Sequence, residues 1–520
     1  MKKILGRIVV VLPAIALQVG WFVLLYMLLN RLLGGHLGSI ISEVFTLLGV
    51  LFVLYLVSKR DESSYKLLWT IVILVFPVLG AIMYLFLGNK KTGKKLEKKL
   101  AEASKDLLSD SFAESGEKAG AKQEDIFNRI KEEEPRIGQT LQHLSESTHF
   151  PILYNGSAKY YPFGELAFAD MCEDLKKAEK YVYLEYFIIE AGKFWDTLVD
   201  ILAERVEKGV DVRVMYDDLG SISTYSVKDI KYLKSRGIKC IPFNPFLLIK
   251  SQLNNRDHRK IMTIDGKVAY SGGINLADEY INETHPFGKW KDLAFRLTGP
   301  AVRSYTYMFA EFWDAFSPSD KIPDELLREE AFEKVNGDSN GYILPYYDSP
   351  MRDEPASNTL FTEMLSMATE YVWFFTPYLM LGDALYDAFI RAAHRGVDVR
   401  VIMPAIPDQK MVHRIGRSYY RELIKAGVKV YEYTPGFVHA KAVVMDGKLC
   451  GIGTVNLDYR SLFLHFECYS LFYKSEMIDT LKNDYLDTLK ECKRITEEEV
   501  TFGGFHRLID GLLRVVAPLM

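Results

Sequence analysis

Apolar residues are concentrated at the beginning of the chain, in three runs at 8–30, 40–57 and 67–88. The first and third runs each hold about 20 mostly apolar, uncharged residues, enough to cross a hydrocarbon core of about 30 Å. The second run is slightly shorter and carries Glu43 near its start. A cleaved signal peptide explains the first run poorly, because the run is long and further apolar segments follow it. We therefore predict that residues 1–89 form a membrane segment with two or three transmembrane helices.

The chain becomes strongly polar after the last apolar run. Residues 90–148 are rich in Lys, Glu, Ala and Ser, a composition that predicts a charged, solvated helical linker. Positive charges on the two sides of the predicted spans nearly balance, so their count barely decides the orientation. A lysine cluster that anionic lipid of the cytoplasmic leaflet would attract follows the last run directly: Lys90, Lys91, Lys94, Lys95, Lys98 and Lys99. We expect a multi-pass cell-membrane protein. The residues that follow the predicted spans are expected on the cytoplasmic side.

The rest of the chain contains an internal repeat. The hexapeptide GVDVRV occurs at 209–214 and again, unchanged, at 396–401. An apolar, aromatic run that is typical of a strand precedes each copy, at 181–187 and at 371–378. A helical stretch lies between this run and the hexapeptide. The repeated order of strand, helix and strand predicts an α/β fold with parallel, buried strands. We place the two predicted α/β domains at 149–335 and 336–500.

The last residues, 501–520, have the pattern of an amphipathic helix. Phe505, Leu508, Ile509, Leu512 and Val516 recur at helical spacing. A helix lying on the bilayer surface and a helix packed on the protein core both fit this pattern, and both stay open.

Composition narrows the range of functions. The formal net charge is −4 and the sequence pI is about 6.3, which gives no general basic surface for nucleic acid. The five cysteines are scattered and show no C-x-x-C spacing, so neither a disulfide framework nor a zinc site is indicated. We expect reduced thiols and no nucleic-acid partner.

Each half of the repeat contains one copy of the motif H-x-K-x-x-x-x-D. In both copies a glycine follows seven residues after the Asp and an Asn ten residues after it. One such motif alone would be a weak signal, but two copies with the same downstream residues, one per repeat, indicate a functional site. The motif residues are His258, Lys260 and Asp265 in the first half and His439, Lys441 and Asp446 in the second, with Asn275 and Asn456 downstream.

The motif composition suits phosphoryl transfer without a metal or another cofactor. A His and a Lys two residues apart on a strand point to the same face, so an imidazole lies beside a fixed positive charge that suits phosphate oxygens. Histidine titrates near neutral pH, so one copy can attack phosphorus while the other protonates the leaving alkoxide. Two histidines therefore predict a covalent, two-step reaction. Each motif Asp can orient a histidine or make a turn, and both roles stay open.

With these motifs the sequence resembles the phospholipase D superfamily and, within it, the bacterial cardiolipin synthases. The resemblance covers nearly the whole chain. It implies two phospholipase D-like α/β/α sandwich domains related by a pseudo-twofold axis, one active site where the motifs meet, and a phosphohistidine intermediate. By analogy, the nucleophile is His258 and the general acid is His439, with the reversed assignment left open.

Other stretches look like supporting motifs of that family. They include Glu185 in YLEYF, Thr376, Pro377 and Tyr378 in FTPYL, Trp290 and Asp292 in KWKDL, and Glu467 after NLDYRS. The resemblance implies that Asn275, Asn456 and Thr454 contact phosphate and that Asp292 and Glu467 orient the histidines. It also places Glu185, with these five residues, among those that bind the substrate. The second half reads G-T-V-N where the family commonly has G-S-x-N, and the threonine keeps the hydroxyl.

The function that the resemblance implies is cardiolipin synthesis, in which two phosphatidylglycerol molecules give cardiolipin and glycerol. Phospholipid substrates and the membrane are then the partners, and the oligomeric state is open. One alternative is a phospholipase D or another phosphatidyltransferase that uses water or a different alcohol. Another is a membrane scaffold without catalytic activity.

Overall fold

The computed structural model describes residue 27 and the ranges 34–59, 61–88, 93–111, 116–154, 156–245, 254–328, 331–332, 341–500 and 504–519. The chain divides into two compact units. We call Met1–Asn89 the N-terminal unit and Lys90–Met520 the C-terminal unit.

The N-terminal unit is helical where it is described. Its elements are α2 (Gly34–Ser58), α3 (Ser63–Val75), α4 (Pro77–Met83) and the π-helical turn η1 (Tyr84–Gly88). The predicted span 67–88 is therefore not one continuous helix. It breaks at Phe76, whose extended backbone precedes Pro77, because a residue before proline is forced away from the helical region.

The three predicted spans have different outcomes. The run 8–30 lies outside the described residues except for Met27, and the run 40–57 lies within α2. In the part of the chain that the structure describes, no helix is both long and apolar enough to cross a membrane.

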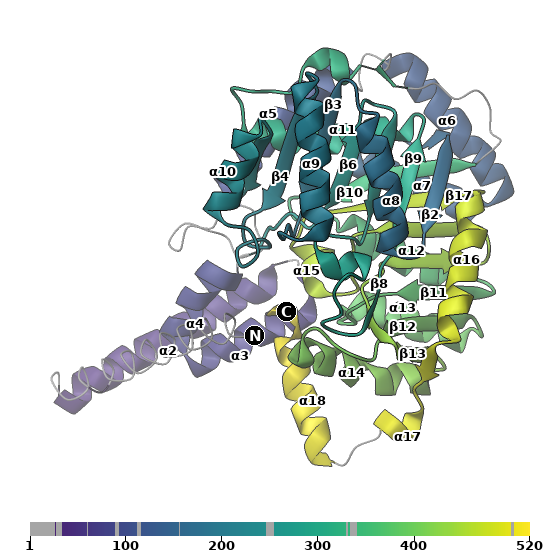
Figure 1. The fold of residues 1–520 in the computed structure, drawn as a ribbon. Helices are drawn as coiled ribbons and strands as arrows, with labels where there is room; N and C mark the ends of the chain where they lie inside the picture. The colour runs from purple at the N-terminus through teal and green to yellow at the C-terminus, as the bar shows by residue number, and fades with distance from the viewer. Residues whose placement is uncertain are drawn as a thin grey trace. The chain divides into compact units, whose positions relative to one another are not determined.

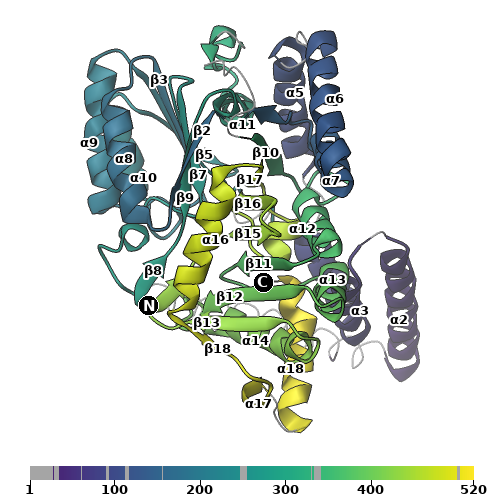
Figure 2. The ribbon, with the colours of Figure 1, turned by 90° about the vertical axis from the view of Figure 1, so that its right-hand side faces the viewer.

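The C-terminal unit contains the repeat as two sheets. The first has the strand order β2-β9-β7-β6-β3-β4-β5. These strands are β2 (Ser157–Tyr161), β9 (Ala294–Thr298), β7 (Val268–Gly272), β6 (Lys260–Ile264), β3 (Tyr181–Tyr186), β4 (Asp211–Asp217) and β5 (Lys239–Phe243). The helices α8 (Gly164–Lys176), α9 (Lys193–Glu207) and α10 (Val227–Ser235) lie along one face of this sheet (Figures 1 and 2).

The second sheet repeats this arrangement, in the order β1-β10-β17-β16-β15-β11-β12-β13-β18. The strands are β1 (Leu153–Tyr154), β10 (Tyr342–Asp348), β17 (Glu467–Tyr473), β16 (Leu449–Gly453), β15 (Ala442–Met445), β11 (Tyr371–Phe375), β12 (Asp398–Pro404), β13 (Lys429–Tyr433) and β18 (Cys492–Arg494). Its helices include α12 (Ala356–Met367), α13 (Asp383–His394), α14 (Lys410–Lys425), α15 (Tyr459–Phe463) and α16 (Glu476–Leu489). The strands β9-β7-β6-β3-β4-β5 correspond in order to β17-β16-β15-β11-β12-β13, which confirms a repeated α/β fold.

Both sheets are mixed, whereas the repeat pattern predicted parallel strands. The strands β3, β4 and β5 are parallel, as are β11, β12 and β13, because helices connect them. The strands that carry the motifs turn back instead: β6 pairs antiparallel with β7, and β15 with β16. The cause is a tight turn at each motif Asp, since Asp265 and Asp446 have φ angles of 53° and 50° and a glycine follows each.

The two halves share one interior. Helix α11 (Ala301–Phe316) is buried along nearly its whole length and contacts both β6 and β10. A separate two-stranded parallel sheet also joins the halves, formed by β8 (Lys289–Lys291) and β14 (Gly436–Val438). Gly436 permits the close approach, since a Cβ there would lie 2.2 Å from the carbonyl oxygen of Lys289.

The predicted linker and C-terminal segment are also helical in the described residues. The helices α5 (Lys94–Ser111), α6 (Gly116–Glu133) and α7 (Pro135–Thr148) precede β1. The short helix α17 (Glu497–Val500), then α18 (Gly504–Val516) and the 3₁₀ turn η5 (Ala517–Leu519) end the chain. One side of α18 packs on α14 through Arg514, which binds Ser418, while Leu508 and Leu512 on α18 are each 62% exposed. The helix thus has both a protein-packed side and an exposed apolar side.

Candidate functional site

The two motif histidines lie where the halves meet. His258 comes two residues before β6 begins, and its backbone N–H donates to the carbonyl oxygen of Phe466 at 2.9 Å. His439 comes directly after β14, and its N–H donates to the carbonyl oxygen of Lys291 at 2.8 Å. Each histidine is therefore fixed to the backbone of the other half.

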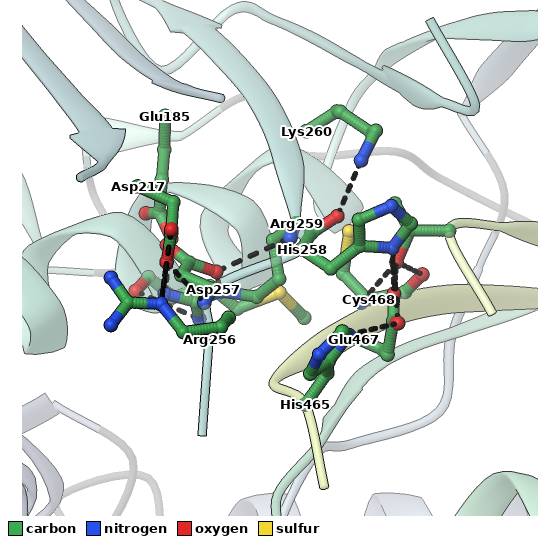
Figure 3. Close-up of polar contacts among 12 residues, drawn as sticks. Glu185, Asp217, Arg256, Asp257, His258, Arg259, Lys260, His465, Glu467 and Cys468 are labelled. Atoms are coloured by element: carbon green, nitrogen blue, oxygen red, sulfur yellow. Dashed lines mark hydrogen bonds and ion pairs between the residues drawn. The ribbon is translucent and has the colours of Figure 1, made fainter. Parts of the chain in front are cut away.

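The side chains of the two histidines are also held across the interface. The Nδ1 atom of His258 lies 2.8 Å from Oε2 of Glu467, and Nδ1 of His439 lies 2.6 Å from Oδ2 of Asp292 (Figure 3 shows the first pair). All four side chains are buried. In the tautomer that carries its proton on Nδ1, each ring donates to its carboxylate and keeps the Nε2 lone pair for chemistry.

The motif lysines lie beside these imidazoles. Lys260 Nζ donates to the carbonyl oxygen of His258 at 2.7 Å, and Lys441 Nζ donates to that of His439. Burial lowers the pKa of Lys260 to about 8 and that of Lys441 to about 7, against the opposing effect of Glu467 and Asp292. The site therefore contains two buried amines, and their charged forms are unfavourable unless an anion binds beside them.

Electrostatics tie the two motifs into one site. Burial lowers the pKa of His258 well below its usual value, and the positive charges of Lys260 and Lys441 lower it further. The pKa of His439 is likewise lowered by burial, then by Lys441 and Lys260. Each histidine therefore interacts with the lysine of the other motif as well as its own.

The motif aspartates contact backbone amides. Asp265 accepts hydrogen bonds at 2.8 Å from the N–H groups of Glu179, Lys180 and Tyr181, where β3 begins. Asp446 accepts the equivalent bonds from residues 369, 370 and 371, where β11 begins. The sequence left open whether each motif Asp orients a histidine or makes a turn. This geometry favours the turn.

Thr454 supports the carboxylate that holds His258. Its hydroxyl donates to Oε2 of Glu467 and accepts a 2.9 Å hydrogen bond from the N–H of Cys468. Its hydroxyl is thus directed to Glu467, where the sequence predicted a phosphate contact.

The two downstream asparagines occupy matching positions after β7 and β16. Asn275 donates to the hydroxyl of Tyr280 at 2.6 Å and accepts from the N–H of Ile188 at 3.2 Å. Asn456 is buried, and its Oδ1 atom has no partner among the described residues. Asn456 therefore offers an unused acceptor next to the motif residues of the second half.

The structure brings Glu185 to Arg259 and not to the two histidines. Glu185 is fully buried on β3, and its carboxylate binds the guanidinium of Arg259 (Figure 3), which also lies over the ring of Phe312 at 3.5 Å. The sequence predicted a substrate contact for Glu185, and the geometry gives it a partner inside the protein instead.

A second buried ion pair positions the segment before His258, and no sequence motif indicated it. Arg256 Nε donates to Oδ2 of Asp217 at 2.9 Å, and the same oxygen accepts from the N–H of Asp257 at 2.9 Å (Figure 3). Burial raises the pKa of Asp217 to about 6 despite the opposing charge of Arg256. Asp217 is the last residue of β4. The ion pair therefore connects the end of β4 to the segment just before His258.

A third imidazole near the site was also missed. The ring of His465 lies 5.9 Å from that of His258, and its Nδ1 is 3.8 Å from Oε1 of Glu467 (Figure 3). Trp290 stands in the matching place beside His439, with ring centroids 5.7 Å apart. Each of these two rings comes two residues before a carboxylate that holds a histidine, a spacing that aligning the repeats would have found.

The carboxyl group that holds His439, that of Asp292, has a raised pKa. Burial raises the pKa of Asp292 to about 7, although Lys441 opposes the shift. Asp292 also needs the glycine next to it, since a Cβ on Gly273 would lie 2.1 Å from Oδ1 of Asp292. Among the described residues, no group of three or more His, Cys, Asp or Glu side chains is arranged to hold a metal ion.

Comparisons with known proteins agree with this site. Residues 171–287 and 361–488 match the family described as cardiolipin synthase, PLD-like domain, and 44–89 match the phospholipase D-nuclease N-terminal family. An uncharacterized protein of Streptococcus mutans is 39% identical over 90% of this chain and 99% of its own length. A cardiolipin synthase of Alkalihalophilus pseudofirmus is 31% identical over 92% of this chain and 94% of its own length.

A solved structure shares the fold. The crystal structure of a phosphatidylserine synthase from Haemophilus influenzae superposes with a TM-score of 0.57 at 14% identity, over 73% of this chain and 97% of that one. The fold, the paired motifs and the full-length relatives together show that this chain belongs to the cardiolipin synthase family of phospholipase D-like proteins.

Proposed function

We propose that the chain joins two phosphatidylglycerol molecules to give cardiolipin and glycerol, through a phosphohistidine intermediate. One observation carries this proposal: two imidazoles, each held by a carboxylate from the other half, share a buried site with two lysines. The cardiolipin synthases that match nearly the whole chain support the choice of substrate.

In the first step, Nε2 of neutral His258 attacks the phosphorus of one phosphatidylglycerol. The bond from phosphorus to the glycerol oxygen breaks, and protonated His439 gives its proton to that oxygen. Glu467 stabilises the positive charge that forms on His258, and Asp292 stabilises the imidazolium of His439 before transfer. The products of this step are free glycerol and a phosphatidyl group on His258.

In the second step, a hydroxyl of another phosphatidylglycerol attacks the phosphohistidine. Neutral His439 accepts the proton of that hydroxyl, and the bond between phosphorus and Nε2 of His258 breaks. Both histidines return to their starting protonation states, so the cycle balances in protons. Cardiolipin leaves, and the same steps run backward when glycerol is abundant.

The lysines explain how His439 can be protonated despite its lowered pKa. A phosphate anion between Lys260 and Lys441 offsets their positive field, which is one of the causes that lower the histidine pKa values. Substrate binding therefore raises the pKa of His439 and prepares the general acid. The lysines also meet the negative charge that develops on the phosphoryl oxygens.

The membrane is the source of both substrates in this proposal. The N-terminal unit buries an aromatic cluster in which the Trp69 and Tyr84 rings are 5.3 Å apart, and it leaves many apolar side chains outside. Leu47, Leu54 and Val75 are each at least 59% exposed, as expected of a surface that meets lipid. The predicted spans within 1–89, the cell-membrane location and the cytoplasmic side of the C-terminal unit belong to the same proposal.

A lipid-product assay tests the proposal. Membranes containing the protein are incubated with phosphatidylglycerol and a metal chelator, and cardiolipin and phosphatidic acid are separated and measured. We expect cardiolipin from the wild type and none from His258→Ala, with synthesis falling as glycerol is added. Phosphatidic acid as the main product would favour hydrolysis, and equal cardiolipin from the His258→Ala variant would overturn the proposal.

A further inference from the structure

One polar pair of the second half has no counterpart in the first. Asp211 and Asp398 begin β4 and β12, and ten residues later the first half has Ser221 where the second has Asp408. Tyr181 and Tyr371 begin β3 and β11, and seven residues later the first half has Ile188 where the second has Tyr378. Only the second half therefore places a carboxylate and a phenol at these positions.

The carboxylate of Asp408 retains capacity for a ligand. Tyr378 donates its hydroxyl to Oδ2 of Asp408 at 2.5 Å, and the N–H of Gln409 donates to Oδ1 at 2.7 Å. A carboxylate oxygen accepts about two hydrogen bonds, so each oxygen can accept another. Ser221 differs, because its hydroxyl already donates to the carbonyl of Phe187 and accepts from the N–H of Ile189.

This pair lies on the side of the site where His439 stands. The ring of Tyr280 is 5.3 Å from that of His439, and the hydroxyl of Tyr280 accepts from Asn275. Tyr378 packs against the apolar cluster of the first half that contains Tyr280 and Trp290. Burial raises the pKa of Asp408, and the charge of Lys441 lowers it against this larger effect. Asp408, Tyr378 and Tyr280 therefore form a polar cluster next to the proposed general acid.

The negative charge of Asp408 is unfavourable at this position for two reasons. The lysines attract the phosphate anion of the substrate, and a negative charge near Lys441 works against that attraction. Asp408 is also partly buried, so its charge is less favourable unless hydrogen bonds compensate it. A neutral group rich in hydroxyls supplies such bonds without adding charge.

We propose that Asp408 and Tyr378 form the subsite that binds the glycerol headgroup beside His439. In this subsite Asp408 accepts a hydrogen bond from one glycerol hydroxyl, while the phenol of Tyr280 donates to a neighbouring one. This inference rests on the proposed function. By microscopic reversibility the leaving glycerol and the attacking glycerol occupy the same place, so one subsite serves both steps and favours glycerol over water as the acceptor.

Asp408→Asn tests the subsite because it keeps the size of the side chain and removes its charge. The assay supplies phosphatidylglycerol and measures the ratio of cardiolipin to phosphatidic acid, together with the glycerol concentration that gives half-maximal exchange of labelled glycerol into phosphatidylglycerol. We expect the ratio to fall and the half-maximal concentration to rise roughly tenfold, the usual effect of losing a charged hydrogen bond. Tyr378→Phe removes only one hydroxyl and should change both measurements in the same direction.

Asp487→Asn is the matched control, because Asp487 lies on α16 with 71% of its side chain exposed and pairs only with Lys490 among the described residues. It should leave the product ratio and the glycerol dependence as in the wild type. Unchanged values in both Asp408→Asn and Tyr378→Phe would overturn the subsite while cardiolipin synthesis itself stands. A wild type that exchanges labelled ethanolamine faster than glycerol would overturn it too, since Asp408 would then recognise an ammonium group. Absence of cardiolipin from the wild type would instead overturn the proposed function.

Discussion

Glu467 of the second half holds the imidazole of His258 of the first half, with Nδ1 and Oε2 2.8 Å apart. Asp292 of the first half holds His439 of the second in the same way, at 2.6 Å. Neither half therefore has a complete pair of histidine and carboxylate by itself. Both halves are therefore needed to form the site.

Glu467→Gln tests how much the carboxylate contributes. The amide keeps the shape but can donate a hydrogen bond to Nδ1, which favours the wrong imidazole tautomer and removes the stabilising charge. We expect the kcat for cardiolipin formation to fall roughly 10²-fold or more, the range typical of lost acid–base assistance. Thr454→Ser keeps the hydroxyl that supports Glu467 and should stay near the wild-type rate. A kcat within about twofold of wild type for the Gln variant would contradict the role given to Glu467.

The phosphohistidine can be trapped if the acid and the nucleophile are different residues. In His439→Ala the attack by His258 still has its nucleophile, but opening of the adduct lacks the base that activates the acceptor hydroxyl. We therefore expect a phosphatidyl adduct to accumulate on the peptide that contains His258, detected by mass spectrometry at neutral or alkaline pH. His258→Ala should show no adduct. An adduct on His439 in the His258→Ala variant would establish the reversed assignment.

Anion affinity should depend on pH through the two motif lysines. Their pKa values in the free protein are lowered to about 8 for Lys260 and about 7 for Lys441. A bound phosphate stabilises the charged amines and raises both pKa values, so binding takes up protons near pH 7 to 8. Phosphate affinity should therefore be highest below about pH 7 and weaken as the pH rises through 7 and 8.

Calorimetric titration of inorganic sulfate, a phosphate analogue whose charge is constant in this pH range, in buffers of different ionisation enthalpy measures both the affinity and the proton uptake. Lys441→Arg should remove part of the pH dependence, because arginine remains charged throughout this range. An affinity that does not change between pH 6.5 and pH 9 would contradict the lowered lysine pKa values.

The sequence predicted the α/β repeat and the two motifs because both are local patterns. His258 and His439 could be named because the motif recurs with the same spacing in both halves, although neither histidine lies within a strand. The exchange of carboxylates is different, because Glu467 reaches His258 only when the halves dock, and no local pattern encodes docking. Its role came from the family resemblance alone.

Two further features of the site depend on contacts between residues that no local pattern brings together. Glu185 lies in a strand whose residues are all buried, and a carboxylate buried there needs a cation, which Arg259 supplies. His465 lies two residues before Glu467, as Trp290 lies two residues before Asp292, so an alignment of the two repeats was needed to find it. For Glu185 the deciding partner, Arg259, is distant in sequence.

The halves are also joined by a buried ion pair that should control both stability and activity. Lys291 is 1% exposed and binds the carboxylate of Asp484 on α16 at 2.6 Å, while its carbonyl oxygen accepts the N–H of His439. Asp484→Asn leaves the ammonium of Lys291 buried without its counter-charge, and removing one partner of a buried pair costs about 3 to 5 kcal/mol. We expect this variant to lower the free energy of unfolding by about 2 to 3 kcal/mol, less than that full cost, since Asp484 is partly exposed.

Activity should fall along with stability, because a shifted Lys291 moves the backbone that fixes His439. Thermal unfolding and the lipid-product assay measure the two effects, with Asp487→Asn as the exposed control. The double variant Lys291→Met with Asp484→Leu removes both charges, so it should recover most of the lost stability if the buried charge is the cause. A double variant as unstable as Asp484→Asn would show that packing, and not the unpaired ammonium, accounts for the loss.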